Sequence, residues 1–443
     1  VVPVFNYNTV FPCVKAFEVF MKFNLQNFSR TIKKLRKEKG VTQADVARFL
    51  GCTYQSFQSI EYGRSTPSSA TLLALAEYFN VSADYLLGRT DLPTAAENPL
   101  LTVITPANEY SEALKASMLP LLPEGTVWRD PADGLEGLRR RRLLFLVALD
   151  EGGCNLAYYR MLSVLRLDGG LLEGCLAALV VTGVGELYTK DVARDLVLSA
   201  NLAGCAFLGR PLVEATGSLR NFRVQAQTQG TDEATAFRLA AAELVERLLA
   251  WEALPPPSRI LALHASARST SNTLDFWELV KAGLPEGVEV QEVCLQNGTL
   301  ADCIGCSYKT CIHFGQQGGC FYGGPMVEEV FPAVRACDAM VMLCANYNDA
   351  LAANLTAFVN RLTALFRQNR FYEKRLFALI VSGYSGGDLI ARQLISGLNM
   401  NKSFYLPPRF CMLETANDRG SLVKLPGIAQ RGALFAGRIM GAS

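Results

Sequence analysis

Residues 42–61 read TQADVARFLGCTYQSFQSIE, and the N-terminal fold follows from them. Thr42 and Thr53 each precede apolar residues with helical spacing, a position typical of the hydroxyl residues that cap helices. Asp45 follows Thr42 by three residues, as in a capping box. Gly51 separates the two patterns and predicts a tight turn between them. We therefore expect two short helices joined by this turn.

The flanking sequence predicts a small helical bundle around this pair. Apolar residues at helical spacing indicate further helices over residues 28–38, 70–79 and 83–87. From Met21 to Thr90 the chain has ten Lys and Arg residues against five Asp and Glu residues, whereas the whole chain of 443 residues has a net charge of only +2. Such local segregation of positive charge indicates a module that contacts nucleic acid.

The bundle resembles the Cro/C1-type (XRE) helix-turn-helix family over almost its full length. The residues that carry the resemblance are Thr42-Gln43-Ala44-Asp45-Val46-Ala47, Gly51, Ile60-Glu61, Gly63, Pro67 and residues 81–88. The resemblance implies binding to a double-stranded DNA operator as a homodimer, with the second helix of the pair in the major groove.

Specific DNA contacts are expected from the polar residues of the recognition helix, because Gln can pair bidentately with adenine. Gln43 and nearby basic residues would contact the phosphate backbone. The residues assigned to DNA are Gln43, Thr53, Tyr54, Gln55, Gln58 and Ser59. The alternative is a helical bundle that serves protein contacts.

Composition sets the broad class of the chain. Hydrophobic residues make up 50% of it, which excludes a mainly disordered protein and suggests two or three domains. The sequence has no apolar run of the length that crosses a membrane. Its 13 cysteines are scattered, which favours a reducing, cytoplasmic compartment. Residues 1–20 are interpreted as a leader that is not translated, with Met21 as the initiator.

Two further blocks follow the bundle at residues 21–90, one over residues 100–251 and one over residues 259–443. In both, apolar runs alternate with helical patterns, which predicts parallel sheets covered on both faces. A linker is expected at residues 90–99 and a stiffer one, with three consecutive prolines, at residues 252–258. We expect an all-α helix-turn-helix bundle followed by two α/β doubly wound domains, with ligands at the carboxyl ends of the strands.

The last block opens with a strand that leads into a polar loop, residues 264–273, and then a helix. Small hydroxyl residues, an Arg and an Asn at such a turn can form a cradle for an anion with the helix N-terminus. His264 is interpreted as a buried structural residue. The loop resembles that of the flavodoxin-like NAD(P)H-dependent FMN reductases, which implies that it holds the FMN phosphate. The matching residues are Ser266, Arg268, Ser271, Asn272 and Thr273.

Two more loops fall at the strand ends where that family holds the flavin ring. One is residues 344–348 and the other, rich in glycine, is residues 382–387. The residues assigned to the flavin in these loops are Ala345, Asn346, Tyr347, Asn348, Ser382, Gly383, Tyr384 and Gly386. The alternative is a flavodoxin-like domain that has lost its flavin. Residues 100–251 are interpreted as a divergent flavodoxin-like domain without flavin.

Four cysteines lie between the second strand of the last block and the next helix, with the spacing C-x2-C-x4-C-x8-C. They are Cys303, Cys306, Cys311 and Cys320. Four thiolates can hold a [4Fe–4S] cluster or Zn²⁺, and the position resembles the cluster loop of iron–sulfur flavoproteins. The spacing also fits redox-active or structural thiols.

These patterns favour a sequence-specific DNA-binding transcriptional regulator with a C-terminal FMN-binding, redox-sensing domain. The alternative is an NAD(P)H-dependent flavin oxidoreductase with an accessory DNA-binding module. A third interpretation is a scaffold in which both sites are inactive. A flavin carries its own chemistry, so no catalytic side chain can be assigned from the sequence.

Overall fold

The computed structural model describes residues 25–79, 81–88, 100–296 and 300–441. The chain forms two compact units, Val1–Asn98 and Pro99–Ser443. The leader predicted at residues 1–20 and the linker predicted at residues 90–99 lie outside the described residues. No helix in the described ranges is both long enough and apolar enough to span a membrane.

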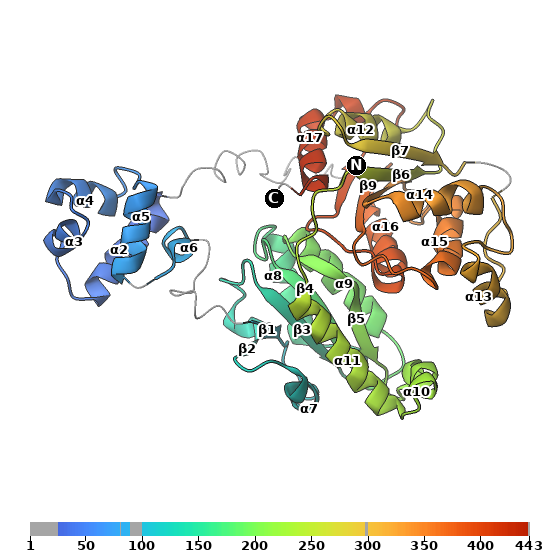
Figure 1. The fold of residues 1–443 in the computed structure, drawn as a ribbon, viewed down its shortest axis with the longest axis horizontal. Coiled ribbons are helices and arrows are strands. Elements are labelled where there is room, and N and C mark those ends of the chain that lie inside the picture. Colours follow the sequence, from blue (N-terminus) through green and yellow to red (C-terminus); the bar gives the residue numbers. More distant parts are fainter. Residues whose placement is uncertain (1–24, 80, 89–99, 297–299, 442–443) are drawn as a thin grey trace, which may run out of the picture. The chain divides into compact units, whose positions relative to one another are not determined.

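The first unit is an all-α bundle. Its described helices are α2 (Leu25–Glu38), α3 (Gln43–Phe49), α4 (Tyr54–Glu61), α5 (Ser69–Phe79) and α6 (Ala83–Leu86), coloured blue in Figure 1. Thr42 caps α3 in a complete capping box, because its side chain accepts from the Asp45 amide while Asp45 accepts from the Thr42 amide at 2.9 Å. The Thr53 hydroxyl caps α4 by accepting from the Ser56 amide at 3.2 Å. The predicted helix pair and both caps are confirmed.

One apolar core holds the bundle together. Phe28 and Ile32 of α2, Val46 of α3, Phe57 of α4 and Leu75 of α5 are all buried in it. Because these residues come from four helices, their burial sets the angle between α3 and α4 and leaves the opposite, polar side of α4 facing solvent.

The second unit contains two parallel sheets, and the first of them is built from residues 102–215. Its strands are β1 (Thr102–Ile104), β2 (Val127–Arg129), β3 (Arg142–Leu149), β4 (Leu176–Gly183) and β5 (Ala206–Ala215), in the order β2-β1-β3-β4-β5. The α-helices of this half are α7 (Ser111–Met118), α8 (Leu156–Leu167), α9 (Thr189–Leu202), α10 (Arg223–Gln229) and α11 (Glu233–Ala250).

The second sheet is built from residues 259–415. Its strands are β6 (Arg259–His264), β7 (Glu289–Cys294), β8 (Ala339–Ala345), β9 (Arg375–Ser382) and β10 (Cys411–Thr415), in the order β10-β9-β8-β6-β7. The helices are α12 (Asn272–Lys281), α13 (Tyr308–Gln316), α14 (Phe331–Ala336), α15 (Ala353–Phe366), α16 (Gly387–Leu394) and α17 (Ile428–Ile439), with π-helical segments at Met326–Val330 and Ile395–Met400. Numbered within each half, both sheets have the flavodoxin-like strand order 2-1-3-4-5. The predicted fold class is confirmed.

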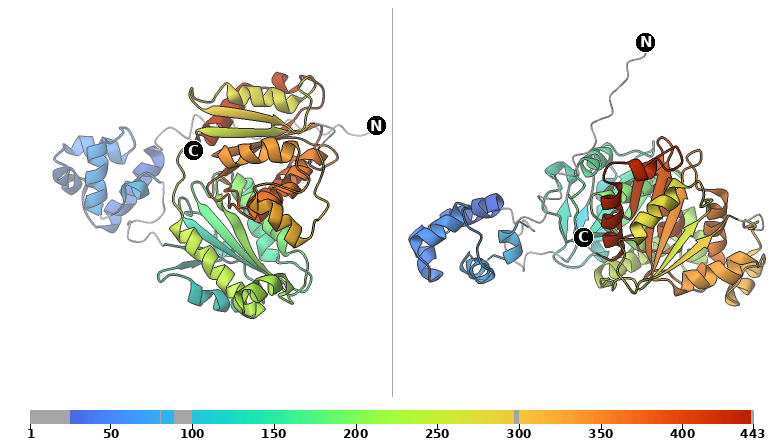
Figure 2. Two further views of the ribbon diagram at one scale, coloured as in Figure 1. Left: turned by 45° about the vertical axis from the view of Figure 1, so that its right-hand side comes forward. Right: turned by 90° about the horizontal axis from the view of Figure 1, so that it is seen from above.

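The two α/β halves share a hydrophobic core. Buried residues of α8 and α9 in the first half belong to the same cluster as those of α14, α15 and α16 in the second, whereas α11 and α12 cover the outer faces. The helices α9 and α16 each follow the fourth strand of their sheet along the chain. They contact each other through an ion pair of 2.7 Å between Asp195 and Arg392. The halves therefore meet through equivalent helices. Figure 2 shows the two sheets of this unit from two further directions.

Several elements depart from the sequence expectations. The strand β5 was not predicted, because Gly209, Arg210 and Pro211 interrupt its apolar pattern. It is an edge strand with a register shift against β4, and Arg210 has φ +51°, so the edge position accommodates the proline. The strand β10 begins only at Cys411, although the sequence before it is also apolar and aromatic. Phe404–Pro408 precedes it as an irregular segment with isolated bridges to Phe207 and Arg375.

The proline-containing linker at residues 252–258 and Trp251, which precedes it, are bonded to residues of both halves. The Arg142 guanidinium donates to the Trp251 carbonyl at 3.2 Å, and Arg375 donates to the Leu254 carbonyl at 2.8 Å. The Trp251 ring also stacks on Tyr405 with 5.2 Å between the centroids. These contacts fix the connection between the two sheets.

Candidate functional site

The helix α4 holds four of the six residues that the sequence assigns to DNA, whereas Thr53 caps this helix and Gln43 lies on α3. Tyr54 and Gln55 are exposed, whereas Gln58 and Ser59 are half-buried. The Thr53 side chain is occupied as the cap of α4, with its hydroxyl also 2.8 Å from the Ser56 hydroxyl. Thr53 therefore has a structural role as a helix cap. Gln55 is exposed, and its side chain makes no hydrogen bond to another described residue.

A hydrogen-bond network fixes the other polar residues of this face. The Tyr54 hydroxyl donates to the Gln43 side-chain oxygen at 2.7 Å, and the Gln58 amide donates to the Tyr54 hydroxyl at 3.3 Å. The Gln43 amide nitrogen donates in turn to Glu61. Gln43, Tyr54 and Gln58, which come from two helices, are thus brought together.

Glu61 anchors this network from inside the bundle. Its side chain has no exposure, and its carboxylate accepts from the Arg36 guanidinium at 2.5 and 3.4 Å. Sequence reasoning placed Glu61 on the helix but did not recognise its positioning role. The only signal was an acidic residue at a position of the helix that faces the core.

The loop after β6 lies against the N-terminus of α12. Ser266 and Thr273 are buried, and among the described residues neither hydroxyl has a hydrogen-bond partner. The Ser271 hydroxyl caps α12 by accepting from the Leu274 amide at 3.3 Å. His264 is buried as expected, with its Nδ1 3.1 Å from the Ser266 carbonyl oxygen, and burial lowers the pKa of its imidazole. This edge therefore offers two unused hydroxyls beside a helix N-terminus, the chemistry that suits a phosphate.

Two other residues of this loop are already engaged. The Arg268 guanidinium forms ion pairs with Glu278 at 2.8 Å and with Glu292 at 2.6 Å. The Asn272 amide donates to the carbonyl oxygens of Ala416 at 3.1 Å and Asp418 at 2.9 Å. Asn272 therefore ties the first loop to the segment after β10, whereas Arg268 would have to exchange a carboxylate partner to reach an anion.

Asn346 joins the loops after β8 and β9. Its amide nitrogen lies 3.2 Å from the Ser382 hydroxyl and 2.9 Å from the Ser385 carbonyl oxygen. Gly386 caps α16 with φ +84°, and a Cβ atom there would lie 2.0 Å from an Asp349 side-chain oxygen, so the turn requires glycine. The sequence-assigned loops thus share one edge of the sheet.

The other residues assigned to flavin in these loops differ in their exposure to solvent. Tyr347 and Tyr384 are exposed by 57% and 82%, whereas Ala345 is half-buried at the end of β8. Asn348 has φ +53° in the turn after Tyr347. A Cβ atom on Gly383 would lie 3.0 Å from the Asn417 side-chain oxygen. The two tyrosine rings therefore remain open to a planar ligand at this edge.

The four cysteines of the loop after β7 are all free thiols. Cys311 lies in α13, where its sulfur accepts from Arg367 Nε at 3.4 Å, and the Cys306 sulfur lies 3.9 Å from the Tyr322 hydroxyl. Among the described residues, no three His, Cys, Asp or Glu side chains form a group that could hold a metal ion. The predicted [4Fe–4S] cluster or zinc site at Cys303, Cys306, Cys311 and Cys320 is therefore not supported.

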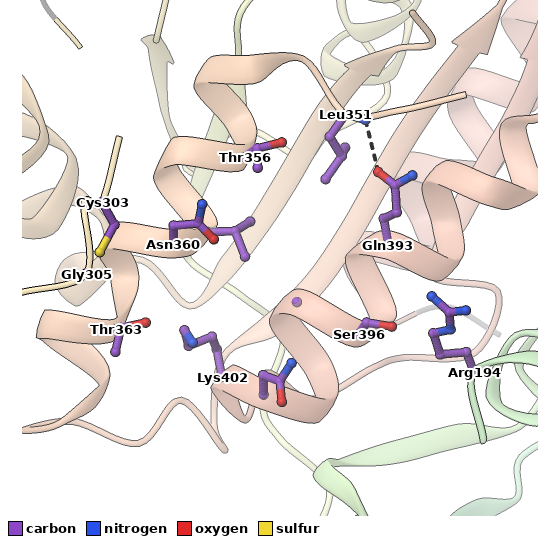
Figure 3. A pocket seen from close by; sticks show the side chains of 13 residues that line it. Arg194, Cys303, Gly305, Leu351, Thr356, Asn360, Thr363, Gln393, Ser396 and Lys402 are labelled. Carbon is purple, nitrogen blue, oxygen red and sulfur yellow. Dashed lines mark hydrogen bonds between the residues drawn. The ribbon is translucent and has the colours of Figure 1, made fainter. Parts of the chain in front are cut away.

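Sequence reasoning missed how this loop is held. Arg361 of α15 is buried, and its guanidinium donates to the Ala301 carbonyl at 3.2 Å and to the Gly323 carbonyl at 2.8 Å. One side chain thus fixes both ends of the cysteine loop. A cavity beside the loop, drawn in Figure 3, also has no signal in the sequence, because its lining comes from segments far apart in the chain.

Solved structures that match this chain include two of low sequence identity. A quinone oxidoreductase, NAD(P)H:quinone oxidoreductase from Methanothermobacter marburgensis, is 16% identical, with a TM-score of 0.30, and the match covers 41% of this chain and 92% of that one. RosB with bound 8-demethyl-8-formylriboflavin-5'-phosphate is 14% identical, with a TM-score of 0.32, over 43% of this chain and 77% of that one.

Family models and curated relatives match defined parts of the chain. The model "NADPH-dependent FMN reductase" matches residues 258–418, and the model "Helix-turn-helix" matches residues 32–86. The SPbeta prophage-derived uncharacterized HTH-type transcriptional regulator YonR of Bacillus subtilis (strain 168) is 40% identical over 63 residues, or 14% of this chain and 58% of YonR. A second B. subtilis relative, the uncharacterized HTH-type regulator YqaE, is matched over 52% of its length.

Other curated regulators are covered more fully. The HTH-type transcriptional regulator ImmR of B. subtilis (strain 168) is 32% identical over 89 residues, or 20% of this chain and 68% of ImmR. The uncharacterized HTH-type transcriptional regulator y4dJ of Sinorhizobium fredii (strain NBRC 101917 / NGR234) is 42% identical over 65 residues, or 15% of this chain and 79% of y4dJ. Through its N-terminal bundle, the chain belongs to the helix-turn-helix family of transcriptional regulators.

Proposed function

We propose that the chain is a sequence-specific DNA-binding transcriptional regulator whose C-terminal α/β half binds FMN and responds to its redox state. The observation that carries the proposal is the presence, in one chain, of a region matched by the helix-turn-helix model and a region matched by the FMN reductase model. A regulator so built would sense and respond within a single protein.

DNA reading is assigned to the exposed face of α4. Gln55 would contact base edges directly, because its side chain is exposed and makes no hydrogen bond to another described residue. Gln58 and Tyr54 would be presented by the network that ends at Glu61, and Gln43 would contact the phosphate backbone. We infer a homodimer on DNA, since proteins of this class read two half-sites about one helical turn apart.

FMN binding is assigned to the carboxyl edge of the second sheet. The unused hydroxyls of Ser266 and Thr273, with the N-terminus of α12, would hold the phosphate. Asn346 and Gly386 shape the turn that would approach the ring, and Tyr347 would cover it. When bound, FMN supplies hydride or electron transfer, and NAD(P)H is the proposed electron donor.

The test is operator affinity in two redox states. Full-length protein is titrated against an operator selected in vitro, at one salt concentration, before and after reduction with dithionite. We expect affinities that differ between 5- and 150-fold, which corresponds to the roughly 1–3 kcal/mol typical of coupled sites. The matched control is the Ser266→Ala/Thr273→Ala variant, which lacks flavin and should bind equally in both conditions. Equal affinities for the flavin-loaded native protein would refute redox sensing.

A second candidate function is an NAD(P)H-dependent flavin oxidoreductase with an accessory DNA-binding module. The match of residues 258–418 to the FMN reductase model favours it. Steady-state oxidation of NADPH with a quinone acceptor distinguishes the two. Many turnovers per bound FMN, unchanged by DNA, support the enzyme, whereas slow single-turnover reduction supports the sensor.

A further inference from the structure

A cavity of about 650 Å³ lies in the second unit. Its walls are α15, α16 with the π-helical segment Ile395–Met400, and the cysteine loop, and Arg194 of α9 completes it from the first half (Figure 3). None of the flavin-assigned residues lines it. Its volume is in the range of small-molecule sites.

The cavity is cationic. Of the described residues that line it, the charged ones are Arg194 and Lys402, and none is a carboxylate. Lys402 lies near the end of α15, where its ammonium is 5.7 Å from the centre of the Phe366 ring, and the Arg370 guanidinium is 4.3 Å from the same ring. Among the described residues, neither Lys402 nor Arg370 has a carboxylate within ion-pair distance. A bound anion would supply the missing negative charge.

The surroundings of Lys402 are unfavourable for its charge. Burial, together with the positive charge of Arg367, lowers the pKa of its ammonium. Arg194 differs, because Asp191 already pairs with one of its terminal nitrogens. Lys402 is therefore the cation that gains most from an anion in the cavity.

Two buried polar atoms of the lining have no hydrogen-bond partner within the part of the chain that the structure describes. They are Arg194 Nε and the Ser396 hydroxyl oxygen. An unsatisfied buried polar group costs about 1–3 kcal/mol, so native proteins rarely leave one without a ligand or water. Ser396 belongs to the π-helical segment, and such irregular turns are frequent at functional sites.

The rest of the wall is partly apolar. Leu351 and Val359 line the same cavity as the two cations. A fully inorganic ion would leave this apolar surface unmatched, whereas an organic body would cover it. The lining therefore fits a molecule with an apolar part and a negative charge.

We propose that this cavity is a binding site for a small organic anion, with its negative charge recognised by Lys402 and Arg194 and a polar group recognised by Ser396. None of the residues assigned to flavin belongs to this site, and the site gives the first α/β half a role, because that half contributes Arg194. A carboxylate, sulfonate or phosphate ester with an aliphatic or aromatic body meets these requirements.

The experiment is isothermal titration calorimetry of the full-length protein with 8-anilinonaphthalene-1-sulfonate, an aromatic anion. We expect saturable binding at one site. Lys402→Gln should weaken it about tenfold, in line with the loss of one charge-assisted contact, and Arg194→Gln should weaken it severalfold. Lys402→Arg, which keeps the charge, should retain most of the affinity. The control Lys424→Gln removes an exposed lysine outside the cavity and should change nothing.

The outcomes separate the site from nonspecific binding. Dissociation constants that are equal for the native protein and Lys402→Gln, with the variant folded by circular dichroism, would overturn the proposal. A lack of saturable binding to the native protein would overturn it too. Full competition by inorganic sulfate at equal concentration would show that the apolar wall contributes nothing, and would also overturn the organic ligand class.

Discussion

Replacing Arg36 by Met should destabilise the helix-turn-helix bundle more than any change at its surface. Arg36 donates to Glu61 at 2.5 and 3.4 Å, and the Glu61 side chain has no exposure to solvent. Removing one partner of a buried ion pair leaves an uncompensated charge and costs roughly 3–5 kcal/mol. A unit of this size has a total stability of roughly 3–10 kcal/mol, so the variant should be close to unfolding. Gln43, which also donates to Glu61, would lose its fixed orientation at the same time.

Hydrogen–deuterium exchange of the full-length protein measures this locally, through peptides that cover α2 to α4. We expect Arg36→Met to reduce the free energy of opening by roughly 3 kcal/mol or more. The double variant Arg36→Met/Glu61→Leu should recover much of the loss, since no buried charge remains. Lys34→Met is the matched control, because the Lys34–Glu38 pair is exposed, with 3.9 Å between its charged atoms, and should contribute less than about 1 kcal/mol. If Arg36→Met behaves like Lys34→Met, Glu61 does not anchor the bundle.

Three further predictions follow from the site geometry. Replacing Gln55 and Gln58 together by Ala should weaken operator binding by roughly 1–3 kcal/mol per lost base contact and relax base preference, as measured by fluorescence anisotropy at fixed salt; unchanged preference would show that other residues read the bases. Replacing Ser266 and Thr273 by Ala should yield folded protein without the visible absorbance of flavin, and retained stoichiometric flavin would place the phosphate elsewhere. Because burial lowers the pKa of His264 below its ordinary value of about 6.5, the unfolded state binds the proton more readily, so stability should fall as the pH drops below about 6.5. Calorimetry should show that the melting temperature of His264→Gln falls less steeply below pH 6.5 than that of the native protein. The same fall in both proteins would show that His264 does not cause it.

Local signals in the sequence were sufficient for the bundle. The caps at Thr42 and Thr53 and the apolar spacing from Phe28 to Ile60 act within a few residues, so the helices can be read directly from the chain. The same holds for the central strands β3, β4, β8 and β9, which are continuous apolar runs because helices cover both faces of each sheet.

Strands at the edges of the sheets and the helix in the cysteine loop could not be predicted from local sequence patterns. The strand β2 has only three residues, and β5 contains Gly209 and Pro211, so neither has an uninterrupted apolar pattern. The helix α13 lies inside the cysteine loop, where the thiols suggested ligation rather than helical structure. Edge strands and loop helices depend on contacts with distant segments, and periodicity carries no information about these contacts.

The ion pairs and hydrogen bonds of the site residues could not be predicted from the sequence either. Arg268 fits a phosphate-loop pattern by its position, but its charge is already matched by Glu278 and Glu292, which lie on α12 and β7. The ion-pair partner of a charged side chain depends on which residues lie near it in space. A sequence motif can therefore identify a candidate binding residue but not the partner that this residue already has. The unengaged hydroxyls of Ser266 and Thr273 are the stronger candidates because no other group in the described protein uses them.

The shared core of the two α/β halves, together with hydrogen bonds across it, determines how a structural change in one half affects the other. The Asn201 amide, from the first half, donates to the Pro407 carbonyl at 2.7 Å, and Asn399, from the second, donates to the Leu208 carbonyl at 2.9 Å. Both amides are buried, so moving one half against the other would leave polar groups unpaired in an apolar interior. The two halves should therefore respond as one body, because a small shift at α16, which begins at the carboxyl edge of the second sheet, is opposed by its contact with α9. An event at the carboxyl edge of the second sheet and an anion in the cavity beside α9 would then act on the same packed interface, which is a physical basis for coupling between them.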